Sequence, residues 1–441
     1  MQLPALRPGD AGDRPAVTVG GRTWTYREFA ELIDQRRLLA FDQPLLCATG
    51  SVVEALTTVF AAAAMNQPVL VTDPASPIPM LDVIPPGTFL VVVTSGTSGH
   101  PKPVLRTAAS WVSSFAPLAE LSGIGTTDRV LLTGPLHATL HLFAAVHTLT
   151  LGAELTDRAD QATAVHAVPA VFAELLRTLP ADAPLRLAVL AGSALPDELA
   201  DRAATRSVSV IEYYGAAELS FVAARRHPQP LKPFPGAEVE LRDGVLWVRS
   251  PFLSLGYPHG TIGPFRRDES GFGTVGDLAA WGPDGGLLIR GRGDAAITTG
   301  GATVLAEDVE AALAVLPGVA AAAVVGLPHP RLGQLVTAVV EPIPGADLLG
   351  LRAAAREVLR DQSLPRRWLI TDRLPRTPGG KVQRHAVAQA AARLTAGDQP
   401  ADDQPTDDHR ASRQSAGGVI EPGAQPGEAW AADLPVLRPL P

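Results

Sequence analysis

The segment TSGTSGHPKP, residues 94–103, directly follows the apolar run FLVVV and combines hydroxyl groups, glycines and a cation. Gly96 and Gly99 allow backbone N–H groups to approach an anion closely, while the hydroxyls and Lys102 add donors and positive charge. This chemistry suits a polyphosphate, although the spacing differs from the Walker pattern G-x-x-x-x-G-K-[ST]. A polar turn without function is the alternative, which the Pro-Lys pair disfavours. The candidate phosphate-binding residues are Thr94, Ser95, Gly96, Thr97, Ser98, Gly99 and Lys102.

The elements that must position this loop alternate along the first half of the chain. Short Val- and Leu-rich runs are separated by helical patterns, and continuous apolar strands with helical crossovers indicate parallel sheets covered on both faces. The expected strands are residues 44–50, 68–73, 89–96, 129–134, 186–192 and 207–215, with helices over 52–65, 140–151 and 171–179. An earlier hairpin is indicated by AVTVGGRTWTY.

The pattern changes after Pro228. From there to about Trp281, strand signals interrupted by Gly and Pro predict a small antiparallel, barrel-like subdomain. We therefore expect an α/β fold: a large N-terminal domain (1–290) of helix-flanked sheets with this subdomain, followed by a small α+β domain (291–395). Residues 396–441 are rich in Asp, Gln, Pro and Gly and predict a disordered tail. Its last stretch, WAADLPVLRPLP, could dock, but a solvated terminus is favoured.

Composition excludes several classes of protein. Of the 441 residues, 46% are hydrophobic and 19% charged, which supplies a large core, and the net charge of −8 gives no concentrated basic surface for nucleic acid. Cys47 is the only cysteine, so one chain can form neither a disulfide framework nor a thiolate metal cluster. No apolar run approaches the roughly 18 residues of a membrane span. We expect a cytoplasmic protein.

Further segments make residues 15 to 390 resemble a known family. They are PLH (135–137), AGSALP (191–196), YYGAAE (213–218), VGDLAAW (275–281), GRGDAAITTGGATVLAEDVE (291–310) and PRTPGGKVQRH (375–385). In this order they resemble the adenylate-forming (AMP-binding) superfamily, and in particular short acyl-CoA synthetases such as o-succinylbenzoate or fatty acid CoA ligases. The resemblance implies that a carboxylate attacks the α-phosphate of ATP, giving acyl-AMP and pyrophosphate, after which a thiol displaces AMP.

The resemblance also implies residue roles in the first step. Lys381 would bridge the substrate carboxylate and the α-phosphate, Glu218 would ligate Mg²⁺, and Asp277 would accept hydrogen bonds from the ribose with help from Arg292. The phosphate loop would hold the β- and γ-phosphates. The remaining residues expected to line the nucleotide are Gly192, Ser193, Ala194, Tyr214 and Gly215.

A second set of residues is implied for the thiol step and the acid. Asp294 would be the hinge about which the small domain turns, bringing Gly300 and Gly301 beside the acyl-adenylate. The acyl or thiol channel would include His137, His141 and Ala216. The two histidines have the i, i+4 spacing of a helical zinc pair, but no third ligand is near in the sequence.

The type of carboxylic acid substrate is constrained by the lack of acidic residues in one segment. Residues 136–151, which match the border of the acyl pocket, contain no acidic side chain to pair with an α-ammonium group, so we expect a carboxylic acid that is not an amino acid. CoA is the expected acceptor, and a phosphopantetheinyl acyl carrier protein is the alternative. The family's hydroxyl before the glutamate is Ala217 here, which suggests a third reading: a non-catalytic protein that binds nucleotide or acyl ligands.

Overall fold

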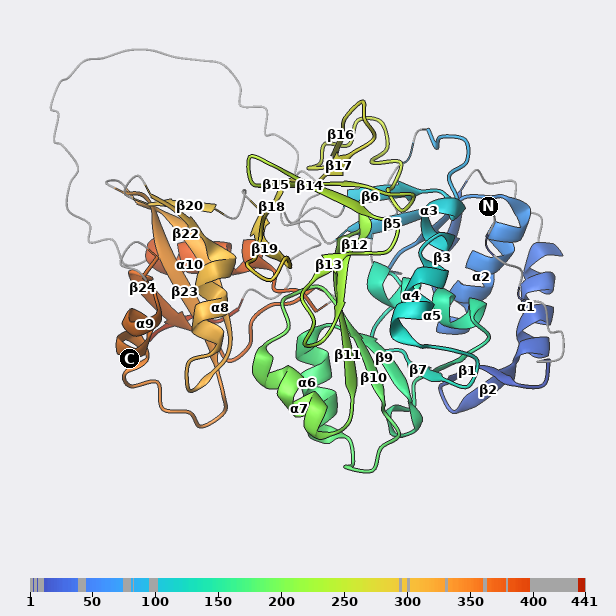
Figure 1. The fold of residues 1–441 in the computed structure, drawn as a ribbon, viewed down its shortest axis with the longest axis horizontal. Helices are drawn as coiled ribbons and strands as arrows, with labels where there is room; N and C mark the ends of the chain where they lie inside the picture. Colours follow the sequence, from blue (N-terminus) through green and yellow to red (C-terminus); the bar gives the residue numbers. More distant parts are fainter. Residues whose placement is uncertain are drawn as a thin grey trace, which may run out of the picture. The chain divides into compact units, whose positions relative to one another are not determined.

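The computed structural model describes residues 3, 6, 12–38, 45–73, 81, 83–94, 102–292, 296–299, 302–329, 332–359, 363–377, 380–396 and 435–440. The chain forms two compact units (Figure 1). The larger unit comprises Met1–Ala296, Leu305–Asp308 and Arg376–Val382, and the second comprises Ile297–Val304, Val309–Pro375 and Gln383–Pro441. The segment that carries Lys381 therefore belongs to the larger unit.

The largest sheet belongs to the larger unit. Its spatial order is β13 (Lys232–Pro233), β12 (Ser220–Arg226), β11 (Ser209–Ala216), β10 (Leu187–Leu190), β9 (Ala164–Ala167), β7 (Arg129–Leu131), β8 (Glu154–Thr156), β1 (Pro15–Val19) and β2 (Arg22–Thr25). The strands from β11 to β1 run parallel, and both edges are antiparallel. Strands β9 and β10 are buried throughout, as expected for a parallel sheet with both faces covered.

Alternate residues of the central strands enter two different cores. Ala164 and Leu187 pack with the helix α5 (Thr139–Thr150), whereas Val165 and Ala188 pack with α6 (Pro169–Thr178) and α7 (Asp197–Thr205). Figure 1 shows α6 and α7 side by side against these strands. Successive side chains of a strand point to opposite faces of the sheet. On β9, residues 164 and 166 therefore face the core with α5, and residues 165 and 167 face the core with α6 and α7.

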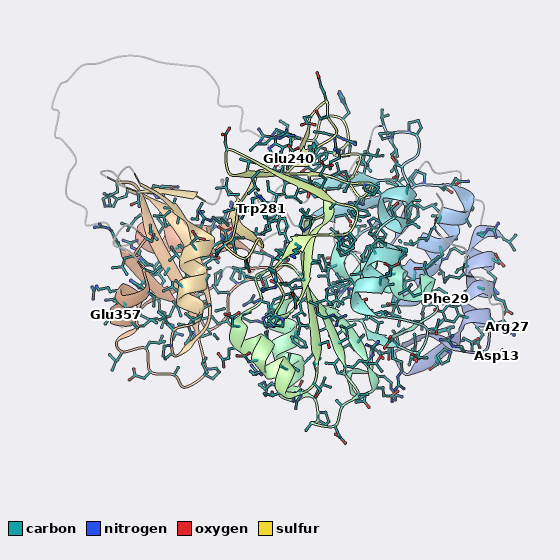
Figure 2. The ribbon with its side chains drawn as sticks, in the orientation of Figure 1. Asp13, Arg27, Phe29, Glu240, Trp281 and Glu357 are labelled. Atoms are coloured by element: carbon teal, nitrogen blue, oxygen red, sulfur yellow. The ribbon has the colours of Figure 1, made fainter. Side chains whose placement is uncertain are left out.

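A second sheet carries the phosphate-loop segment. Its order is β3 (Leu46–Ala48), β4 (Val69–Val71), β5 (Leu90–Thr94) and β6 (Lys102–Arg106). The helices beside these two sheets include α1 (Tyr26–Leu38), α2 (Val52–Met65), α3 (Ala108–Val112) and α4 (Phe115–Ser122). Helix α2 begins at Ser51, whose side chain accepts a hydrogen bond from the Glu54 N–H, and ends at Asn66 in the left-handed conformation. Phe29 of α1 is fully buried, while Arg27 pairs with Asp13 on the exposed surface (Figure 2).

The antiparallel subdomain expected between Pro228 and Trp281 is present. Its strands are β16 (Arg266–Arg267), β17 (Gly273–Thr274), β15 (Val245–Arg249), β18 (Asp277–Trp281) and β19 (Leu287–Arg292), with β14 (Glu238–Arg242) paired to β15. Cross-strand pairing is antiparallel throughout. The sequence thus predicted both the position and the pairing type of this subdomain.

The second unit is a sheet with helices. Its strands are β21 (Ala302–Leu305), β20 (Ala296–Thr299), β23 (Gly333–Pro342), β24 (Arg367–Ile370) and β25 (Arg438–Pro439), with β22 (Val319–His329) paired to β23. The helices are α8 (Ala306–Ala314), α9 (Leu351–Val358) and α10 (Arg384–Ala396). The α+β composition matches the expectation for the C-terminal domain.

The C-terminal strand corrects one expectation. Residues 435–440 do not form a solvated terminus, because β25 pairs antiparallel with β24 and Leu437 and Leu440 are buried. The Leu440 N–H donates to the Trp368 carbonyl at 3.1 Å, and Arg352 donates to the Leu440 carbonyl at 2.9 Å. The sequence misjudged this segment because few apolar residues suffice when backbone groups pair with a sheet edge. Residues 397–434 lie outside the described residues.

Candidate active site

Glu218 follows β11 in the turn to β12, within the YYGAAE motif. Its side chain is 4% exposed, and the Tyr257 hydroxyl donates to Oε1 at 2.7 Å. The Ser254 N–H donates to the Glu218 carbonyl at 2.8 Å, which fixes the backbone of the turn. A buried carboxylate suits Mg²⁺, which proteins commonly hold through one or two carboxylates together with substrate phosphates. The residue therefore fits the predicted role as ligand.

Arg106 was not predicted from the sequence, yet it fixes the same turn. The side chain is 1% exposed, and its guanidinium donates to the carbonyls of Ala217 (2.5 Å), Ser110 (3.1 Å) and Phe252. Burial lowers the Arg106 pKa to about 9, while the negative charge of Glu218 opposes that shift, so the cation persists at neutral pH. The available signal was a charge at the end of the apolar stretch PVLR.

Tyr214 and Asp277, predicted to contact adenine and ribose, lie together. The Tyr214 hydroxyl donates to Asp277 Oδ2, and Asp277 is 7% exposed at the start of β18. In the β18–β19 pairing, Asp277 stands opposite Arg292, of which only the backbone is described. The structure thus brings Tyr214 of β11 and Asp277 of β18 into contact and pairs the backbone of Arg292 on β19 opposite Asp277. A buried carboxylate beside a phenol is suited to accept hydrogen bonds from a vicinal diol.

Lys381 lies in a tight turn of the larger unit. The Thr377 N–H donates to the Lys381 carbonyl at 2.7 Å, and Gly380 adopts φ +82°. A Cβ built at Gly380 would lie 2.5 Å from Val168 Cγ2, and one at Gly192 would lie 3.5 Å from Lys381 Cε. Gly380 therefore permits a close approach to Val168 that a side chain would obstruct, whereas a Cβ at Gly192 would make ordinary van der Waals contact with Lys381. The Lys381 side chain passes beside Gly192, which follows β10.

Three adjacent parallel strands thus end at the same group of predicted residues. Val168 follows β9, Gly192 follows β10, and Tyr214 and Glu218 lie at and after the end of β11. Ser193 and Ala194 are exposed at this edge. Gly215 and Ala216 pair with β12, where a Cβ at Gly215 would lie 2.1 Å from the Ser220 carbonyl oxygen. Ligands of parallel α/β sheets bind outside the carboxyl ends of the strands, which is where these residues lie.

The two channel histidines lie at the start of α5. His141 is 4% exposed, and its Nδ1 lies 3.3 Å from the Thr133 hydroxyl. His137 is half-buried, and burial lowers its pKa while Asp73 opposes that shift. Within the described ranges no group of three His, Cys, Asp or Glu side chains is placed to hold a metal ion. The structure therefore gives no support to a zinc site at these two histidines.

Part of the predicted site lies outside the described residues. These residues are Ser95, Gly96, Thr97, Ser98, Gly99, Asp294, Gly300 and Gly301. The ends of the phosphate loop are described: Thr94 of β5 stands opposite Lys102 of β6 in an antiparallel pair. The loop is therefore closed by a two-stranded hairpin. The described residues also contain no helix that is both long and apolar enough to cross a membrane.

Comparison with known proteins agrees with this geometry. The family model described as AMP-binding enzyme matches residues 61–258, and that of the AMP-binding enzyme C-terminal domain matches residues 308–381. YhfT, an uncharacterized acyl-CoA ligase of Bacillus subtilis, is 30% identical over 347 residues, covering 71% of this chain and 70% of the relative. This chain belongs to the AMP-binding enzyme family. It is an acid–thiol ligase of the AMP-forming class, and the resemblance stated from the motifs is confirmed.

Other relatives support the family and the fold. A probable 2-succinylbenzoate–CoA ligase of Mycobacterium tuberculosis is 29% identical over 382 residues, covering 79% of this chain and 97% of the relative. Among solved structures, o-succinylbenzoate CoA synthetase of Bacillus subtilis with its acyl-adenylate intermediate has a TM-score of 0.74 at 20% identity, covering 88% and 98% of the two chains. ATP-bound MatB of Rhodopseudomonas palustris has a TM-score of 0.74 at 21% identity, covering 89% and 100%. The predicted fold class is confirmed.

Proposed function

We propose that this AMP-binding enzyme uses ATP and Mg²⁺ to convert a carboxylic acid other than an α-amino acid into an acyl-adenylate, and then transfers the acyl group to the thiol of CoA. The position of Lys381 supports this proposal most strongly. Its turn rests on Val168 and its side chain passes Gly192, at the strand ends that also present Tyr214 and Glu218. A long cation beside the predicted nucleotide site is what the first step requires.

The first step brings two anions together. A carboxylate oxygen bonds to the α-phosphorus, the bond from that phosphorus to the bridging oxygen breaks, and pyrophosphate leaves with the electron pair. Lys381 supplies positive charge between carboxylate and α-phosphate, where negative charge develops in the transition state. Asp277 and Tyr214 orient the ribose and adenine, which holds the α-phosphorus in line for attack.

Glu218 and Arg106 serve the same step through the triphosphate. Mg²⁺, when bound, neutralises phosphate charge, and Glu218 is the residue that would hold it. Arg106 donates to the Ala217 carbonyl and so keeps the peptide before Glu218 in place. In the second step a CoA thiolate attacks the acyl carbon, and the carbon–oxygen bond to AMP breaks. We assign the hinge for this step to Asp294 and the passage of the pantetheine arm to Gly300 and Gly301.

The test is pyrophosphate release from ATP with a panel of aliphatic, aryl and amino acids, followed by transfer to CoA or to a holo-carrier protein. The proposal predicts release with non-amino acids, and conversion of the adenylate to a thioester when CoA is added. Release only with amino acids would contradict the proposed acid. Acyl transfer only to the carrier protein would identify the carrier protein, rather than CoA, as the acceptor. A failure to release pyrophosphate with any acid would support a non-catalytic protein.

A further inference from the structure

Three histidines of the larger unit are buried beside one another: His141 and His147 on α5, and His166 on β9. Their exposed fractions are 4%, 0% and 1%. The ring centroids of His147 and His166 are 6.3 Å apart, and Phe143 stacks on His147 at 5.7 Å. Buried polar groups in folded proteins normally have hydrogen-bond partners. The ring nitrogens that lack a partner therefore indicate which donors and acceptors a ligand would have to supply.

The contacts of His141 and His147 define their protonated nitrogens. The Thr133 hydroxyl donates its one proton to the His166 carbonyl at 2.8 Å. It must therefore accept the hydrogen bond from His141, so Nδ1 of His141 carries the proton. His147 Nε2 lies 3.1 Å from the Phe115 carbonyl, which can only accept, so Nε2 carries the proton. His147 Nδ1 is therefore a bare acceptor. It is buried and has no hydrogen-bond partner within the described chain.

His166 is the least satisfied member of the cluster. Both of its ring nitrogens are buried, and neither has a partner among the residues that the structure describes. Burial lowers the pKa of His166 to about 3 and those of His141 and His147 to about 4, so all three rings are neutral at physiological pH. A neutral imidazole has one N–H donor and one acceptor. The pair His147 and His166 therefore presents two unmatched acceptors and one unmatched donor.

The position of β9 connects this cluster to the active site. Ala164 faces the core that includes α5, and His166 and Val168 follow at the two-residue period, so all three share that face. Val168 is the residue against which the Lys381 turn rests. Two residues of extended chain span roughly 7 Å. His166 is therefore two residues, or roughly 7 Å of extended chain, from Val168, against which the Lys381 turn packs.

We propose that His147 and His166 form the distal end of the acid-binding site and select a carboxylic acid whose far end carries a hydroxyl group. The inference rests on the proposed function, since it assumes that the acid carboxylate lies at Lys381. A hydroxyl donates its proton to the bare nitrogen of one ring and accepts the N–H of the other. A plain hydrocarbon end leaves the nitrogens unmatched, and a second carboxylate has no proton to donate and would be buried among neutral rings.

The direct test is calorimetric binding to the full chain of two matched acid series. One series is hexanoate, 6-hydroxyhexanoate and adipate, and the other is benzoate, 4-hydroxybenzoate and terephthalate. We expect the hydroxy acid of at least one series to bind about tenfold or more tightly than its plain and dicarboxylate analogues, because a site built to pair a hydroxyl rejects ligands without one. Equal binding within both series, tighter binding of the dicarboxylates, or no binding of any acid would overturn the inference.

Variants separate this role from a structural one. His166→Phe keeps a flat ring but removes both nitrogens, so the preference for the hydroxy acid should disappear while the plain acid still binds. His259→Gln, at an exposed position in the antiparallel subdomain region, is the control and should retain the preference. An unchanged preference in His166→Phe would overturn the assignment. Pyrophosphate release with the same acids reports on the proposed function separately: selective binding without release would contradict the function and leave the selectivity intact.

Discussion

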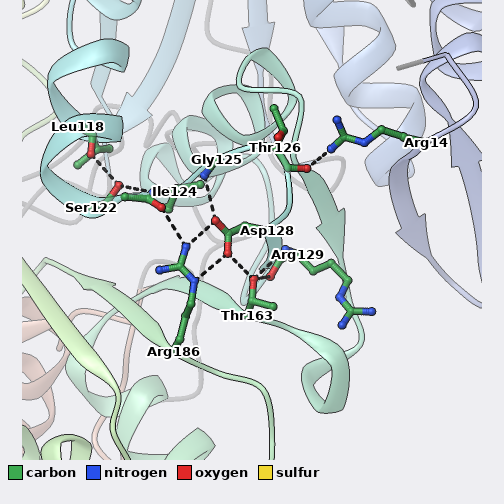
Figure 3. Close-up of polar contacts among 11 residues, drawn as sticks. Arg14, Leu118, Ser122, Ile124, Gly125, Thr126, Asp128, Arg129, Thr163 and Arg186 are labelled. Carbon is green, nitrogen blue, oxygen red and sulfur yellow. Dashed lines mark hydrogen bonds and ion pairs between the residues drawn. The ribbon is translucent and has the colours of Figure 1, made fainter. Parts of the chain in front are cut away.

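Two buried polar clusters lie at opposite ends of the short strand β9, and they differ in how completely their hydrogen bonds are matched. At the amino end, Asp128 is 3% exposed and accepts from Arg186, the Thr163 hydroxyl and the Gly125 N–H (Figure 3). Three residues further along the chain from Thr163, His166 has no partner for either ring nitrogen within the described residues.

The difference separates a structural cluster from a ligand site. Burial alone would raise the Asp128 pKa, but the hydrogen bonds from Arg186, Gly125 and Thr163 outweigh it and the pKa is lowered. Such a group is stable as it stands and needs nothing from outside. Buried rings with unmatched nitrogens cost stability until a partner arrives, which is the arrangement expected where a substrate completes the site.

The largest difference between the clusters should appear in acid. The folded-state pKa values of about 4, 4 and 3 for His141, His147 and His166 lie below the ordinary value of 6.5, so the unfolded chain binds more protons between these limits. The contribution of these rings to the free energy of unfolding is therefore fully present above pH 6.5. It falls as the pH decreases, by up to about 1.4 kcal/mol per pH unit for each ring. Melting temperature from pH 7.5 to 5 should fall more steeply in the wild type than in a His147→Phe, His166→Phe double variant. Equal slopes would contradict the neutral cluster.

The second test breaks the matched cluster. Asp128→Ala leaves the Thr163 hydroxyl and Gly125 N–H without their acceptor and should destabilise the larger unit by about 2 kcal/mol. Denaturant unfolding measures this loss. Acid selectivity of the folded fraction should be unchanged, because no bond of this cluster reaches His166. A variant that lost selectivity without losing stability would show that the two clusters are not separate.

The C-terminal strand offers a third, smaller test of a matched region. Ending the chain after Leu434 removes β25, with two buried leucines and its backbone pairing to β24, and should destabilise the second unit by about 1 kcal/mol after the ordering entropy is offset. Thermal unfolding of the two chain lengths measures it. Substituting Val436, which is 76% exposed, by Ser is the matched control and should have little effect. An unchanged melting temperature on truncation would restore the expectation of a solvated terminus.

The sequence could predict which motif residues form the candidate site, but not the hydrogen-bond partners of single buried polar residues. The sequence predicted roles for Glu218, Tyr214 and Asp277, because each lies in a segment whose order and spacing resemble the family, and the structure brings Tyr214 and Asp277 into contact. Arg106 and His166 were missed because a single polar residue in an apolar strand, as in PVLR or AVHA, has no distinguishing pattern. Whether such a residue is matched depends on groups distant in the chain, such as Ala217 for Arg106, and only the fold brings these together.

Single-turnover acyl-adenylate formation by Lys381→Ala, compared with Lys232→Ala, tests the proposed chemistry most directly. Lys232 is exposed on β13, at the edge of the large sheet and separated from β11 by β12, so it controls for the loss of a lysine. Loss of a preorganised charge at the transition state should slow adenylate formation by roughly 10²–10³-fold, while Lys232→Ala retains the wild-type rate. ATP binding should persist in both variants, because Glu218, Tyr214 and Asp277 are unchanged. Adenylate formation at the wild-type rate by Lys381→Ala would contradict the account.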